Sequence, residues 1–199
     1  TDLRQLPVLQ GGGRLRALRD PGRRRRRRGL VQLLGREGLM DVIDLLGDPA
    51  YRHMLLNHVP IVGLAVSLLA LLAGVVLRQH AITLLGLVLV ALTAGSSLPV
   101  ARFGDAAYPD IYDILDGHGR AWLDHHVDVA ETWLPLLYAN AVLAIVALVL
   151  GAVKRDLLLP SALVVVLVGA GALVSAGAIG SSGGRVQHPE FRLQDLPDQ

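Results

Sequence analysis

The chain has 199 residues, of which 52% are hydrophobic and 18% charged, and it contains no cysteine. With a mean hydropathy of +0.48, it is too apolar for a soluble domain of this length, which indicates a membrane protein. The lack of cysteine excludes disulfides, thiolate metal sites, iron–sulfur clusters and cysteine nucleophiles. The formal net charge of +2 hides an asymmetry, because eleven of the nineteen Lys and Arg residues lie within residues 1–36.

Residues 1–37 are predicted to be a disordered basic tail, with six consecutive arginines from Arg23 to Arg28. Blocks of like charge are typical of disordered segments that bind nucleic acid or anionic lipid. Three interpretations stay open: a basic arm, the edge of a fragment, or a non-native upstream reading frame ahead of Met40. Nucleic-acid binding is not predicted, because no aromatic residues interleave the arginines and no nucleic-acid-binding fold is recognisable.

Residues 38–56 are predicted to be an amphipathic interfacial segment. Apolar residues recur at helical spacing from Leu39 to Leu46, with aspartates between them. This pattern favours a short helix lying on the membrane surface. Gly47, Asp48 and Pro49 are expected to end that helix.

Residues 57–181 are predicted to form an antiparallel bundle of four transmembrane helices. The four apolar spans are about 59–77, 81–101, 132–153 and 157–180. Each is close to the roughly 20 residues that cross about 30 Å of hydrocarbon, and a backbone in lipid is helical unless it closes a barrel. The fold class is therefore an all-α integral membrane protein.

Two tight hairpins fix the topology, one after the first span and one after the third. The acidic and histidine-containing loop 102–131 and the polar C-terminal tail 182–199 then lie at the opposite end of the bundle. This end, which we call the polar end, gathers most of the titratable residues: His58, Asp105, His118, His125, His126, Glu131 and His188.

The positive-inside rule gives two orientations. A cytoplasmic arginine tail would make the polar end cytoplasmic. Without the tail, Arg78, Lys154 and Arg155 make the two hairpins cytoplasmic. We favour the second orientation, in the plasma (inner) membrane, with the polar end periplasmic or extracellular.

The candidate site is a set of imidazoles and carboxylates at the polar end. Imidazole with carboxylate suits zinc, iron, copper or manganese without thiolates. The candidate metal ligands are His58, His125, His126, Asp128, Glu131 and His188. No span carries a histidine in its interior, so a haem stack crossing the membrane is excluded, and a single interfacial haem would use His58 with either His125 or His188.

The segments NHVPIVGL (from Asn57), RFGDAAYP, DHHVDVAE and GGRVQHPE carry a resemblance. They resemble an uncharacterised family of four-span bacterial membrane domains whose first span opens with an H-F-P-I motif; here Val59 replaces the aromatic. The resemblance implies a four-span fold. Because some members are joined to c-type cytochrome domains, it also implies a redox setting with a cytochrome c-type partner.

Two hypotheses for function stay open, and the residues identify no enzymatic activity. In the first, the protein is a redox accessory subunit that binds one metal ion or one haem through His58, His125 and His188, with Asp128 and Glu131 as ligands or supporting groups. In the second, it is a structural or assembly protein that docks a partner at the polar end and binds no cofactor.

Overall fold

The computed structural model describes residues 40–192, and the predicted basic tail and the end of the C-terminal tail lie outside the described residues. The chain divides into two compact units, Thr1–Leu46 and Gly47–Gln199. Residues 40–47 are helical and exposed, as expected for the short amphipathic helix. All the following elements belong to the second unit.

The first span is built from three consecutive helical segments: α2 (Pro49–Leu56), a π-helical turn η1 (Val59–Gly63) and α3 (Leu64–Val76). Asp48 separates α2 from the preceding helix, because its side chain accepts a hydrogen bond from the Tyr51 main-chain N–H at 3.0 Å. Pro49 follows as the first helical residue, where a missing N–H costs nothing. The Gly-Asp-Pro sequence therefore ends one helix and begins another.

A tight turn joins α3 to α4 (His80–Gly95). Arg78 has a positive φ of 52°, and the Gln79 N–H donates to the Gly74 carbonyl at 2.9 Å, which is the hydrogen bond of a Schellman cap. The two helices pack at backbone distance, since a Cβ on Gly74 would lie 2.6 Å from the Thr83 nitrogen and one on Gly86 would lie 2.6 Å from the Leu71 Cα. Glycine is therefore required on both sides of this contact.

The predicted loop 102–131 is helical except at residues 115 and 116. Helix α5 (Ser97–Ile114) continues the second span, and α6 (Gly117–Val153) begins after Asp116, whose side chain accepts from the Gly119 N–H at 2.7 Å. The 37 residues of α6 measure about 55 Å at 1.5 Å per residue, well beyond the roughly 30 Å of a hydrocarbon core. The polar part of the chain is therefore a helical extension of the bundle.

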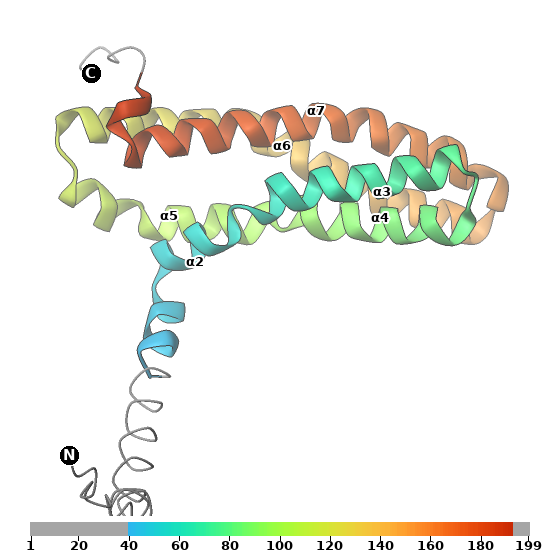
Figure 1. The fold of residues 1–199 in the computed structure, drawn as a ribbon, viewed down its shortest axis with the longest axis horizontal. Coiled ribbons are helices and arrows are strands. Elements are labelled where there is room, and N and C mark those ends of the chain that lie inside the picture. The colour runs from blue at the N-terminus through green and yellow to red at the C-terminus, as the bar shows by residue number, and fades with distance from the viewer. Residues whose placement is uncertain (1–39, 193–199) are drawn as a thin grey trace, which may run out of the picture. The chain divides into compact units, whose positions relative to one another are not determined.

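A short 3₁₀ turn, Arg155–Leu157, leads into α7 (Leu158–Gln187). This helix is longer than the predicted span, because Ser182 and Val186 are buried near its end. Figure 1 shows α6 and α7 side by side, with the two tight hairpins at one end of the bundle and the α5–α6 turn at the other. The arrangement confirms the topology deduced from the sequence.

The surface of the bundle is apolar where it would meet lipid. Leu69, Leu92, Val142 and Leu167, one from each long helix, are between 58% and 67% exposed, while small residues of α6 such as Ala144 and Ala147 are buried. Close packing of small residues inside and large apolar residues outside is typical of helices that associate in a bilayer. The four helices are long and apolar enough to cross a membrane, as the sequence predicted.

Candidate functional site

The polar end has a small hydrophobic core of its own. Trp122, Leu123 and Val186 are buried there, and side chains of α5 pack against them. Trp122 is only 5% exposed although it precedes the apolar span of α6 by more than two turns. This core holds α5, α6 and the end of α7 together outside the predicted spans, so the residues on their surface have fixed positions.

Two arginines of the polar end, Arg120 and Arg185, contact aromatic rings. Arg120 lies 4.8 Å from the centre of the Tyr112 ring and donates to the Tyr112 carbonyl at 2.9 Å. Arg185 lies 5.4 Å from the centre of the Trp122 ring. Cations over aromatic faces are attracted by the ring quadrupole. Neither arginine forms an ion pair with a carboxylate in the described part of the chain.

The carboxylates of residues 102–131 fall into two groups. Asp116 caps α6, and Asp124 accepts a hydrogen bond from the Tyr108 hydroxyl. The others are exposed on α5 and α6, and none forms an ion pair with a described residue: Asp105, Asp110, Asp113, Asp128 and Glu131. We call these five residues the acidic surface.

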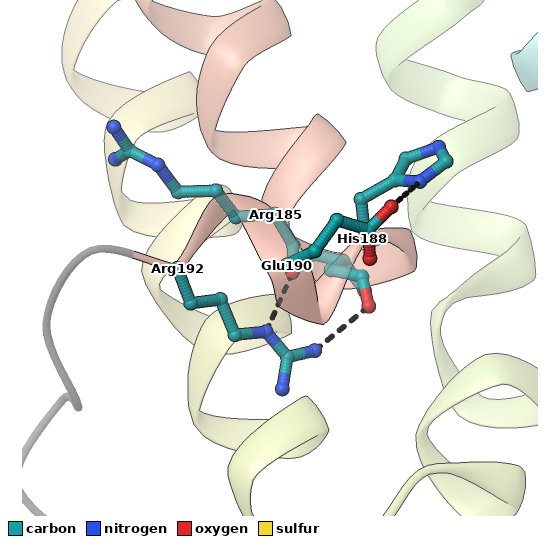
Figure 2. A network of polar contacts seen from close by, with 5 residues as sticks. Arg185, His188, Glu190 and Arg192 are labelled. Carbon is teal, nitrogen blue, oxygen red and sulfur yellow. Dashed lines mark hydrogen bonds and ion pairs between the residues drawn. The ribbon is translucent and has the colours of Figure 1, made fainter.

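The end of α7 is closed by the residues that follow it (Figure 2). The Arg192 side chain donates to the Arg185 carbonyl at 2.8 Å and to the Val186 carbonyl at 3.0 Å. His188 donates from Nδ1 to Glu190 at 3.0 Å. The main-chain N–H of Glu190 and the His188 imidazole hold the pKa of the Glu190 carboxyl below its ordinary value. The contacts of His188 and Arg192 thus lie within the C-terminal cap.

The structure gives the three histidines of the predicted site separate surroundings. His58 is exposed and precedes η1, His125 stacks edge-on against Trp122 with ring centres 5.5 Å apart, and His188 pairs with Glu190. Asp128 and Glu131 are exposed on α6. Among residues 40–192 no group of three or more histidine and carboxylate side chains is placed to hold a metal ion.

A different histidine pair is formed by His53 of α2 and His126 of α6. Their ring centres are 6.4 Å apart and their planes are inclined by 80°. His53 Nδ1 lies 2.9 Å from the Val100 carbonyl oxygen, and His126 Nδ1 lies 2.9 Å from the Ser182 hydroxyl oxygen. Both rings are half-buried. With its hydrogen-bond partners, the pair therefore connects four segments far apart in the sequence: α2, α5, α6 and α7.

Glycines make room for both rings. A Cβ on Gly104 would lie 2.9 Å from His53 Nδ1, and one on Gly183 would lie 3.0 Å from His126 Cε1. His126 is one of the candidate ligands predicted from the sequence, whereas His53 is not. The sequence carries a usable signal for His53, since it lies five residues before His58 on the same side of the first span.

No protein-family model, curated protein or solved structure matches the chain. The resemblance to the four-span bacterial family stays a prediction from the short motifs that carry it.

Proposed function

We propose that this protein is an assembly protein of the membrane, whose polar end docks a partner protein that carries a basic surface. One observation supports the proposal most directly. The acidic surface presents five exposed carboxylates from two helices, and two of the arginines nearby, Arg120 and Arg185, contact aromatic rings instead. Like charges held together at a protein surface attract a partner of opposite charge and speed its association.

The hydrophobic core of the polar end supports the same function. Docking is less costly in free energy when the surface is already ordered in the free protein. Trp122 and its neighbours pack α5 against α6 and α7, so the acidic surface is carried by a folded helical platform next to the membrane. If the favoured orientation holds, this platform faces the periplasm or the cell exterior, and the partner is found there.

The competing hypothesis is a redox accessory subunit that holds a metal or haem at His58, His125 and His188. It requires these side chains to converge, whereas each has a different neighbour. A cytochrome c-type partner, implied by the family resemblance, is compatible with docking if that cytochrome is basic. A basic c-type cytochrome is accordingly a suitable first probe.

The test uses the full chain in lipid nanodiscs of zwitterionic lipid, with a basic c-type cytochrome as the probe and an acidic protein of similar size as the negative control. We expect binding of the basic probe alone, weakening as salt rises, because exposed charges are screened beyond about 8 Å at 0.15 M. Neutralising Asp113, Asp128 and Glu131 together should weaken binding further. Asp156→Asn, at the opposite end of the bundle, is the matched control and should leave it unchanged.

Two outcomes would contradict the proposal. One is binding that is insensitive to salt and to neutralisation of the acidic surface. The other is equal binding of the acidic and basic probes, which would indicate a non-specific apolar contact.

A further inference from the structure

We propose that His53 and His126 form a binding site for one transition-metal cation of the copper or zinc class, held between the two imidazole Nε2 atoms. This site is independent of the docking function and is different from the ligand set predicted from the sequence. Three observations carry it: the hydrogen-bond partners of the two Nδ1 atoms, the distance between the rings, and the glycines that seat them.

The hydrogen bonds of the two Nδ1 atoms favour the same tautomer in both rings. The Val100 carbonyl oxygen can only accept, so His53 Nδ1 carries the hydrogen in the contact at 2.9 Å. The Ser182 hydroxyl lies 2.8 Å from the Ile179 carbonyl oxygen and 2.9 Å from His126 Nδ1, so that when it donates to the carbonyl it accepts from Nδ1. In this tautomer each neutral imidazole has a lone pair on Nε2. Metal-binding histidines are typically oriented in this way, by a carbonyl or other oxygen on the second ring nitrogen.

The distance between the rings suits a shared ion. A histidine nitrogen binds zinc or copper at about 2.0–2.1 Å, and the ring centre lies about 1.1 Å behind that nitrogen, so two rings on one ion have centres about 5–6.5 Å apart. The observed separation of 6.4 Å lies at the wide end of this range. It fits near-linear coordination, which Cu(I) accepts with two ligands. A tetrahedral zinc ion would draw the rings closer and add water or another external ligand.

The surroundings of the pair suit a site more than a buried structural contact. Both histidines are half-buried, so the pair keeps contact with solvent, from which external ligands could come. Gly104 and Gly183 allow each ring to lie directly against a helix backbone, which restricts its rotation. A bound ion would join α2 to α6, and through Ser182 to α7, at the polar end of the bundle.

The test measures metal affinity in the full chain, purified in detergent and stripped with a chelator. Cu(I), under anaerobic reducing conditions, and Zn(II) are titrated in separate experiments against chromogenic chelators that compete for each ion. We expect one equivalent of at least one of the two ions per chain. The ion that binds identifies the class, since Cu(I) alone indicates two-coordinate binding and Zn(II) indicates added external ligands.

Asparagine is the informative replacement at both positions. Its amide N–H can still donate where Nδ1 donates, but it has no lone pair at the position of Nε2. His53→Asn and His126→Asn should therefore keep the fold and each abolish the stoichiometric binding. His118→Asn and His80→Asn remove histidines outside the pair and should bind as the wild type does. Ser182→Ala, which loses the group that orients His126, should bind about 10–100-fold more weakly.

A spectroscopic measurement on the unaltered chain covers the case in which a variant does not fold. X-ray absorption of the loaded protein should show two imidazoles bound to the metal. The proposal is overturned if the metal has no imidazole ligand or more than two. It is equally overturned if the wild-type chain binds neither Cu(I) nor Zn(II) more tightly than the His53→Asn and His126→Asn variants do.

Discussion

The neighbouring glycines Gly183 and Gly184 offer a sensitive test of how His126 is seated. Both lie near the end of α7, but a Cβ on Gly184 would meet nothing within 4 Å. A Cβ on Gly183 would lie 3.0 Å from His126 Cε1 and 3.3 Å from both ring nitrogens. The same substitution at adjacent positions therefore differs only in its contact with one imidazole.

The magnitudes follow from that contact. Alanine gains up to about 1 kcal/mol over glycine within a helix, so Gly184→Ala should stabilise the protein by somewhat less than this near the helix end. Gly183→Ala has the same gain but displaces the imidazole from the Ser182 hydroxyl, and an unsatisfied partly buried polar group costs about 1–3 kcal/mol. We expect Gly183→Ala to be less stable than Gly184→Ala by about 1–3 kcal/mol.

Thermal unfolding in a single detergent measures the difference, at about 2–4 °C per kcal/mol for a chain of this size. Combining each alanine with His126→Ala is the control, because the penalty at Gly183 should disappear once the ring is absent. If Gly183→Ala is as stable as Gly184→Ala with the ring present, the described position of His126 is refuted.

Three further changes test other parts of the fold. Gly86→Ala would place its Cβ 2.6 Å from the Leu71 Cα and should lower the free energy of unfolding by about 1–3 kcal/mol, because it forces the two helices apart. Gly95→Ala is the control and should be tolerated, since its nearest atom would be 3.9 Å away. Denaturant titration compares the two variants. Arg78→Gly should stabilise by about 1 kcal/mol, because a left-handed residue with a Cβ is strained, and an unchanged midpoint would argue against the Schellman turn. Trp122→Ala should cost about 3–5 kcal/mol and increase hydrogen exchange selectively in the polar end; uniform exchange across the bundle would contradict a separate core there.

The four spans could be predicted because their signal is local and strong. A run of about 20 apolar residues has few stable alternatives in lipid, and short connections force neighbouring helices to be antiparallel. The positions of the turns at Arg78 and at Arg155–Leu157 therefore agree with the sequence. The connection 102–131 is helical except at residues 115 and 116, which its composition does not reveal, because composition separates apolar from polar segments and not helix from coil. Trp122, which anchors the polar core, interrupts that polar stretch and was the available clue.

The pairing of His53 with His126 could not be predicted from the sequence. The antiparallel order of the four spans places His125 and His126 at the same end of the bundle. It does not indicate which of the two side chains faces another helix. The Val100 carbonyl that orients His53 is a main-chain group, so the residue type at position 100 does not predict this contact. The contacts of Gly104 and Gly183 with the two rings are equally unpredictable, because glycine occurs throughout this chain. These groups come together only because α2, α5, α6 and α7 meet at this place in the fold. The asparagine variants therefore test the tertiary structure as well as metal binding.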